Sequence, residues 1–258
     1  MSAAEVRIAG GRVPPAVLGT IAVAWAMAIG AEISGRGSAL HHDALIEGRL
    51  PYALALVLFL VAWQAMVAAM MLPSSLPLVR LFGAAAAGQP RPRAAMAAFL
   101  GGYALVWTAF GALALTFDLG VHRSVDSIGW LNDHQWLIGP SVLAVAGAFQ
   151  FTKLKDACLE SCRLPSQFML RHYRRGTGGG FRLGVRHGAF CVGCCWALML
   201  VMFAAGVASL VWMALLTVLM VHEKTRPTGR RVVPVTGLAL LGMSSTVLLY
   251  SAYAAGAI

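Results

Sequence analysis

Long apolar runs alternate with short polar stretches along the whole chain. They fall at about 15–33, 51–72, 93–117, 134–151, 187–206 and 232–256, and a shorter run lies at 208–222. An α-helix needs about 20 apolar residues to cross the hydrocarbon core of a bilayer. The pattern therefore predicts an all-α fold, a polytopic transmembrane helical bundle of about seven spans, or about six if one segment is re-entrant or cleaved.

The composition is that of an integral membrane protein. Of the 258 residues, 59% are hydrophobic and 12% are charged, whereas about a quarter of the residues in soluble domains are charged. The longest polar stretch, residues 152–183, is too short for an independent soluble core. We therefore expect a single integral membrane domain over residues 1–258, with a cytoplasmic linker at 152–183.

The linker and the residues after it contain three local patterns. Lys153–Phe168 has the pattern of a short amphipathic helix at the membrane interface, which Pro165 would end. The run Gly176-Thr-Gly-Gly-Gly180 lacks the Lys-Ser/Thr of a phosphate-binding loop, so we predict a flexible link to the next span. Gly184 and Gly188 form a small-xxx-small pair, which is typical of close helix packing.

Positive charge is distributed unevenly between the two sides of the expected bundle. The formal net charge is +10, but Lys and Arg lie at the ends of the apolar runs, so a nucleic-acid partner is not expected. With seven spans, all of them except Arg36, Arg49 and Arg123 fall on the side of the N terminus. By the positive-inside rule, this side is cytoplasmic and meets anionic lipid head groups. We therefore predict a multi-pass protein of the bacterial inner membrane with a cytoplasmic N terminus.

The opposite side carries acidic residues and histidines in its expected loops. They are Glu32, His41, His42, Asp43, Glu47, Asp118, His122, Asp126, Asp133 and His134. Imidazole and carboxylate groups attract divalent cations. Polar loops and positive-inside topology give the same composition without any site, and this simpler interpretation is preferred for the individual residues.

The strongest chemical pattern lies in the run at 187–206, which begins His187-Gly-Ala-Phe-Cys191-Val-Gly-Cys194-Cys195. In a helix, His187, Cys191 and Cys195 are spaced i, i+4, i+8 and share one face. Cys194, three residues after Cys191, projects from the same face. Thiolate and imidazole groups are ligands for ions such as Cu(I) and Zn(II) rather than for hard cations such as Mg²⁺.

Further ligand-type residues reach the same membrane depth from three other segments. They are Cys158 and Cys162 in the polar linker, Met70 and Met71 where the second span ends before Pro73, and His222 at the end of the 208–222 run. Cys158 and Cys162 are spaced i, i+4, so their thiols share a face of the expected interfacial helix. The predicted metal site consists of Cys158, Cys162, Cys191, Cys194, Cys195, His187, Met70, Met71 and His222.

Each of these residues also has a simpler interpretation. A structural disulfide framework is disfavoured by the odd number of cysteines and by the reducing compartment expected on this side. Cysteine and methionine, however, also pack in apolar helices without any metal. His187 can also be interpreted as an imidazole at the membrane interface. The run His222-Glu223-Lys224 can be interpreted as a charged helix end. The grouping of all five cysteines favours metal or redox chemistry for the set.

Copper is the first choice of metal and zinc the second, because a thioether is a reasonable ligand for Cu(I) and a poor one for Zn(II). The leading hypothesis is binding, delivery or transfer of Cu(I), with a membrane protein or a metallochaperone as partner. The alternative is a copper- or thiol-dependent oxidoreductase that acts on a lipid-soluble substrate, so the question of enzymatic activity stays open. A third hypothesis is a structural partner protein that packs through its glycine faces.

Several of these segments together resemble a bacterial family of predicted metal-binding integral membrane proteins, a domain of unknown function. The segments are A-M-M-L-P at 69–73, K-L-K-D-A-C-L-E-S-C-R-L-P at 153–165, R-H-G-A-F-C-V-G-C-C-W-A-L-M at 186–199, L-V-W-M-A at 210–214 and E-K at 223–224. The resemblance extends from about Trp63 to Gly229 and implies a helical membrane fold with a metal site at the five cysteines. The chain departs from the family pattern at Lys153, where proline is expected, and at Ala208-Ser209, where Met-Asn is expected.

Overall fold

The computed structural model describes residues 13–35, 51–205 and 209–255, and within these ranges it is helical throughout, with short connections and no strands. The elements are α2 (Pro15–Ile33), α4 (Tyr52–Ala86), α5 (Pro92–Ser127), α6 (Gly129–Asp133), η2 (Gln135–Leu137), α7 (Ile138–Phe149), α8 (Lys153–Arg163), α9 (Pro165–His172), α10 (Thr177–Ala205), α11 (Leu210–Thr225) and α12 (Gly229–Ala254). The all-α fold expected from the apolar runs is confirmed.

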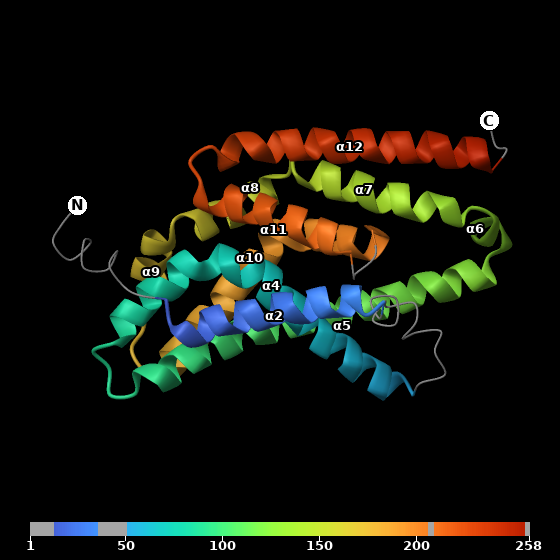
Figure 1. Cartoon of the computed structure of the whole chain (residues 1–258). Coiled ribbons are helices and arrows are strands. Elements are labelled where there is room, and N and C mark those ends of the chain that lie inside the picture. Colours follow the sequence, from blue (N-terminus) through green and yellow to red (C-terminus); the bar gives the residue numbers. More distant parts are fainter. Residues whose placement is uncertain (1–12, 36–50, 206–208, 256–258) are drawn as a thin grey trace.

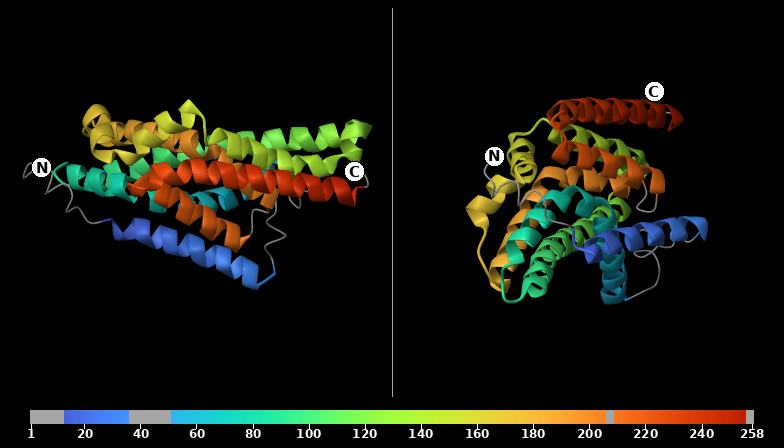
Figure 2. Two further views of the ribbon diagram at one scale, coloured as in Figure 1. Left: turned by 90° about the horizontal axis from the view of Figure 1, so that it is seen from above. Right: turned by 60° about the vertical axis from the view of Figure 1, so that its left-hand side comes forward.

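The helices form an elongated bundle with two distinct ends (Figures 1 and 2). One end holds the α4–α5 turn, the α11–α12 turn, α8 and α9, and we call it the basic end because of the many Lys and Arg residues in these segments. The opposite end holds α6 and the end of α12 (Figure 1). Asp118, Asp126 and Asp133 lie toward this opposite end, in the last part of α5 and in α6. Most of the positive charge therefore lies at one end of the fold.

Among the residues that the structure describes, five helices are long and apolar enough to cross a membrane, and their spans lie in α2, α4, α5, α10 and α12. A sixth exists if Gln135–Phe149 and α8, which meet at an angle of 65°, count as one broken span. The expected count of about seven is not confirmed. The run at 134–151 yields only the 12-residue α7, and the run at 208–222 yields the 16-residue α11, which falls short of a full crossing.

The second apolar run does not end before Pro73 as expected, because α4 continues through Pro73 and Pro77 to Ala86. Proline has no N–H, so Pro73 leaves the carbonyl of Ala69, four residues earlier, without its helical partner. The indole Nε1 of Trp25, on α2, donates a hydrogen bond to this carbonyl over 3.1 Å. A tertiary contact thus supplies what the proline removes, and the helix passes beyond the expected end of the span.

α5 and α10 cross at backbone contact, and glycines make the contact possible. A Cβ placed on Gly184 would overlap the carbonyl oxygen of Phe99, and one on Gly188 would lie 3.0 Å from Cβ of Val106. The prediction of close packing through Gly184 and Gly188 is therefore confirmed. The packing occurs inside the chain, so these glycines are not free to bind a second protein.

The glycine run before this contact is not a flexible link. α10 begins at Thr177, so Gly178–Gly180 form its first turn, and Gly176 has the positive φ of 86° that the preceding turn requires. A Cβ on Gly180 would lie 2.6 Å from the carbonyl oxygen of Ala95, at the start of α5. The run is helical because its lack of side chains lets it pack on α5.

The expected interfacial helix at 153–168 is divided into two. Thr152 caps α8, with its hydroxyl accepting a hydrogen bond from the Lys155 backbone N–H. α8 stops before Leu164, whose non-helical backbone precedes Pro165 at the first position of α9. Pro165 therefore ends one helix, as expected, and also starts the next.

Replacing Gly184 with alanine should destabilise the bundle, because the new methyl group collides with backbone rather than with a flexible side chain. We expect a loss of about 3 kcal/mol or more, the upper part of the range for overpacked cores. Gly101→Ala is the matched control on α5, because a methyl group added there would meet nothing within 4 Å. Alanine should gain about 1 kcal/mol at that position through helix propensity. Denaturant unfolding in detergent, followed by Trp fluorescence, measures both. Equal stability of the two variants would contradict the close crossing.

Candidate metal centre

The three cysteines of α10 lie inside the basic half of the bundle. Cys191, Cys194 and Cys195 are each at most 1% exposed. Because they are spaced by three and four residues, they lie along one side of α10, facing α4, α8 and α11. Their neighbours from other helices are sulfur, hydroxyl and ammonium groups, so this buried region is chemically distinct from the apolar core around it.

The two cysteines of α8 lie against those of α10. Cys162 Sγ is 4.0 Å from Cys194 Sγ. Cys158 covers Gly193, where an added Cβ would lie 2.6 Å from the Cys158 sulfur. All five cysteines are free thiols. The structure thus brings together the two cysteine groups that the sequence places on separate segments.

A methionine of α4 joins the same group. Cys195 Sγ lies 3.6 Å from the thioether sulfur of Met71. With metal–sulfur bonds of about 2.3 Å, two sulfurs on one ion are separated by about 3.7 Å at a tetrahedral angle, about 4.0 Å at 120° and about 4.6 Å when linear. The separations of the Cys195–Met71 and Cys162–Cys194 pairs are therefore close to those of sulfurs that share an ion. Met70 is equally buried and belongs to the same buried cluster of side chains as Met71 and the cysteines.

The sulfurs form close pairs rather than a complete cage. Within the described residues, no three His, Cys, Asp or Glu side chains are arranged so that they could hold one ion. A structural zinc site needs about four such ligands around one point. The arrangement is better suited to an ion that is satisfied by few, soft ligands, including a thioether.

His187 does not contact the sulfurs directly. Its Nε2 lies 3.0 Å from Ser75 Oγ, Ser75 donates to the Tyr103 hydroxyl over 3.4 Å, and that hydroxyl lies 3.2 Å from Cys191 Sγ. The imidazole stacks on Tyr103 with ring centroids 5.5 Å apart. His187 is therefore linked to Cys191 through a chain of hydrogen bonds, and neither Ser75 nor Tyr103 was a candidate from the sequence.

Lys224, rather than His222, is the residue of α11 that reaches the thiols. Its Nζ lies 3.2 Å from Cys191 Sγ, 3.9 Å from Cys195 Sγ and 3.1 Å from Ser74 Oγ. Residues two apart on a helix are turned by about 200°, so His222 faces away; its Nε2 lies 3.0 Å from Thr228 Oγ1. The sequence interpretation of His222-Glu223-Lys224 as a charged helix end missed this contact, because a lysine at the end of an apolar run is normally an anchor in the interface.

A buried ion pair holds α8 in place. Lys155 and Glu223 are 0% and 2% exposed, and Nζ lies 2.8 Å from Oε2. Lys155 also donates to the side-chain oxygen of Gln150. The second carboxylate oxygen of Glu223, Oε1, is buried without a hydrogen-bond partner in the described part of the chain. This pair joins α8 to α11 and so positions Cys158 and Cys162 against α10.

The thiols of α8, a helix that lies outside the five candidate spans, are protonated at neutral pH. Burial raises the pKa of Cys158, and the nearby Cys194 raises it further. The hydrogen bond with Cys194, followed by burial, raises the pKa of Cys162 well above its ordinary value. Metal ions bind thiolates, so an ion that binds either sulfur must displace its proton.

The acidic and histidine residues of the opposite end do not form a comparable group in the described residues. His122 Nδ1 lies 3.8 Å from a carboxylate oxygen of Asp118, one helical turn away. His134 stacks on Trp130 with ring centroids 4.6 Å apart. His41, His42, Asp43 and Glu47 lie outside the described residues.

Comparison with known proteins identifies the family. The family model PpoB2, described as copper chaperone, matches residues 60–247, which include all five cysteines, Met71 and Lys224. The chain belongs to this copper chaperone family. No curated protein and no solved structure matches it. The family supports copper handling and copper as the metal partner, whereas zinc, the second choice from the sequence, has no support.

Breaking the buried ion pair of this copper chaperone family member should loosen α8. Lys155→Met leaves Glu223 buried and unpaired, and Glu223→Leu leaves Lys155 buried without its carboxylate, each at a cost of about 3–5 kcal/mol. The double variant Lys155→Met/Glu223→Leu should lose much less than the sum, because no isolated charge remains. Unfolding in detergent measures this cycle. Additive losses in the double variant would show that the two charges do not stabilise each other.

Proposed function

We propose that this chain is a membrane-embedded copper chaperone that holds Cu(I) at the cysteine group of its basic end and transfers it to a partner. The observation that carries the proposal is the approach of the α8 and α10 thiols, with Cys162 and Cys194 sulfurs 4.0 Å apart. The thiols of α8 and α10 come from two helices that are separated in sequence by α9. A soft metal ion that is shared by these thiols explains why they lie together inside the bundle.

The ligand set favours Cu(I). The main ligands are Cys191, Cys194 and Cys195, with Cys162 and Met71 completing the coordination and Cys158 beside them. Cu(I) accepts thiolate and thioether ligands, and pairs of sulfurs at 3.6 and 4.0 Å suit an ion held by few of them. Lys224 supports the same assignment, because thiolates in excess of the single charge of Cu⁺ leave negative charge that a buried ammonium group offsets.

We infer that the protein lies in the bacterial inner membrane with the cysteine group toward the cytoplasm. The candidate spans carry apolar side chains on their outer surfaces, and Leu113, Phe117 and Leu238 are between 65% and 74% exposed. Lipid is the environment in which such surfaces are stable. The concentration of Lys and Arg at the end that holds α8 and α9 supports a cytoplasmic position for that end and for the N terminus.

Delivery is favoured over oxidation of a lipid-soluble substrate. A cavity that reaches Lys224 is lined largely by charged residues of α8 and the α11–α12 turn, which suits an ion or its carrier and not a hydrocarbon or a quinone. A chaperone must also release its metal. The ligands approach from α4, α8 and α10, and α8 is a short polar helix joined to α11 by a buried ion pair. Such a site can open toward a membrane or soluble acceptor protein.

Substitution of Cys191, Cys194 and Cys195 by serine should abolish Cu(I) binding, because serine hydroxyls are hard, protonated ligands. Anaerobic titration of purified protein against a coloured Cu(I) chelator measures affinity and stoichiometry. Met202→Leu, on the same helix and equally buried, is the control and should bind as the wild type does. Retention of copper by the triple variant would refute the proposed function.

Met71 and Met70 offer a matched pair of neighbours that are both 0% exposed. Met71→Leu removes the sulfur that lies 3.6 Å from Cys195 and should weaken Cu(I) binding by about 10-fold, a loss typical of removing a supporting group at a metal site. Met70→Leu should leave the affinity unchanged. The same chelator titration tests both variants. Weaker Cu(I) binding by Met70→Leu, with unchanged binding by Met71→Leu, would show that Met70 supplies the thioether ligand.

A further inference from the structure

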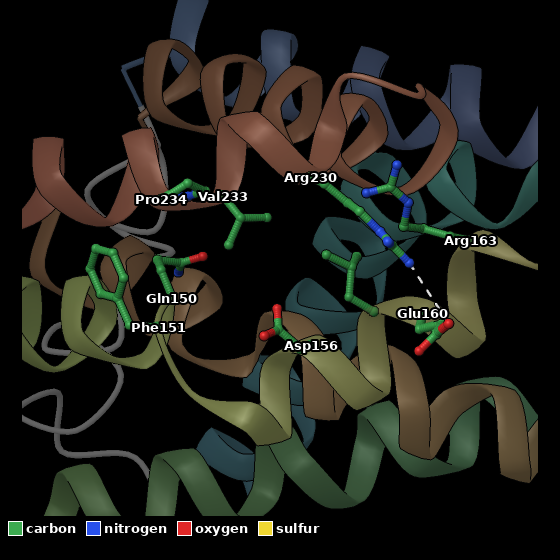
Figure 3. Close-up of a pocket in the computed structure, with 9 residues that line it drawn as sticks. Gln150, Phe151, Asp156, Glu160, Arg163, Arg230, Val233 and Pro234 are labelled. Atoms are coloured by element: carbon green, nitrogen blue, oxygen red, sulfur yellow. Dashed lines mark ion pairs between the residues drawn. The ribbon is translucent and has the colours of Figure 1, made fainter.

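A cavity of about 440 Å³ lies at the basic end, between α8 and the α11–α12 turn. Its charged residues are Glu160, Arg163, Lys224, Arg226 and Arg230. A neighbouring cavity of about 530 Å³ shares Glu160, Arg163 and Arg230 with it. Figure 3 shows these three side chains together at one side of the larger cavity, with Arg230 reaching toward Glu160. The two cavities therefore meet at a pair of guanidinium groups.

Lys224 connects this cavity to the thiols. It lines the cavity, and its Nζ lies 3.2 Å from Cys191 Sγ and 3.9 Å from Cys195 Sγ. The side chain thus forms part of the wall between the cavity and the cysteine group. A ligand in the cavity would therefore lie beside the side chain that contacts two of the sulfurs.

The charge of the cavity is the opposite of what a free copper ion requires. Four basic residues and one acid repel a Cu⁺ ion that approaches alone. Cu(I) bound by two thiolates carries one negative charge, and carboxylates on the thiol compounds add more. Such an anionic complex is attracted to the cavity, and electrostatic steering of this kind raises association rates by about 10- to 1,000-fold.

The guanidinium groups are placed to receive carboxylates. Arg163 Nη2 donates to the backbone carbonyls of Arg226 and Pro227, over 2.8 and 3.3 Å, which fixes its position. Its Nη1 is buried and has no hydrogen-bond partner in the described part of the chain. Arg230 has only a loose contact of 3.7 Å with Glu160, and both side chains are largely exposed. Donors therefore outnumber acceptors here, and carboxylates bind arginine through paired hydrogen bonds.

We propose that this cavity receives copper as an anionic Cu(I) complex of a small, carboxylate-bearing thiol and passes it to Cys191 and Cys195. The inference rests on the proposed function and adds the form in which copper arrives. In the exchange, two Cu–S bonds to the carrier break and two Cu–S bonds to the protein form. The two cysteine protons move to the departing thiolates, and copper stays Cu(I) throughout.

A small carrier fits the cavity better than a protein does. Its volume lies within the range of about 300–1,000 Å³ that is usual for small-molecule sites. Lys224 forms the inner wall, and the negatively charged complex would lie beside this ammonium group once copper has moved inward. A protein donor would touch only the outer arginines and could not bring its own thiolates into the recess.

The test measures Cu(I) uptake from two donors by the full-length protein in detergent. One donor is the Cu(I) complex of glutathione, which is anionic, and the other is the cationic Cu(I)–acetonitrile complex. The variant is Arg226→Glu/Arg230→Glu, two exposed positions of the cavity rim. The control is Arg171→Glu/Arg182→Glu, which makes the same change of charge at a different basic cavity, formed by α9 and α10.

The rim variant should take copper from the glutathione complex at least 10-fold more slowly than wild type, and the difference should vanish in high salt. Uptake from the acetonitrile complex should be unchanged or faster, and the final copper content should be the same. The control variant should resemble wild type with both donors. Equal slowing in the control, or an unslowed rim variant, would overturn the entry route while leaving copper binding intact. Failure of wild type to bind copper from either donor would instead refute the proposed function.

Discussion

The buried ion pair between Lys155 and Glu223 is the contact on which the meeting of the two cysteine groups depends. α8 is polar, contributes two of the five thiols and is tied to α7 by a short connection. Its Lys155 is fully buried in a region where an unpaired ammonium group costs several kcal/mol. Glu223, on α11, faces the same cost. Each charge is paired only when α8 is docked, so this ion pair favours the arrangement in which the two cysteine groups meet.

The two buried lysines of this region have different partners, and the difference separates structure from function. The charge of Lys155 is balanced by the carboxylate of Glu223, and its Nζ also donates a hydrogen bond to the side-chain amide oxygen of Gln150. Lys224 contacts the hydroxyl of Ser74 and the thiols of Cys191 and Cys195. These thiols carry a negative charge only when they lose their protons. Lys155 therefore stabilises the packing of α8 on α11. Lys224 gains a charged partner only when Cys191 or Cys195 loses its proton, as binding of a metal ion would require.

Local periodicity predicted a large part of this molecule. Spacings of three and four residues placed Cys191, Cys194 and Cys195 on one side of a helix, and the order of the apolar runs brought Cys158, Cys162 and Met71 to the same depth. Features set by distant partners could not be found in this way. The passage of α4 through Pro73 depends on an indole from α2, and the helical glycines after Gly176 depend on the surface of α5.

The residues that the sequence analysis missed share a physical property. Lys155, Glu223 and Lys224 are charged residues near helix ends, and in a membrane protein this pattern usually indicates contact with head groups and water. Their burial is a consequence of tertiary packing between α8, α10 and α11. Tyr103 and Ser75 were missed for a related reason, since a hydroxyl in an apolar helix gains a chemical role only from the side chains that face it.

The glycine contact between α5 and α10 has a mechanical consequence. Two backbones that touch without intervening side chains cannot slide or separate without losing the whole contact, so the helix that bears Cys191, Cys194 and Cys195 is the stationary half of the site. α8 is short, polar and flanked by breaks at Thr152 and Leu164. Any change in the spacing between the two cysteine groups is therefore expected to come from movement of α8, while α10 stays fixed against α5.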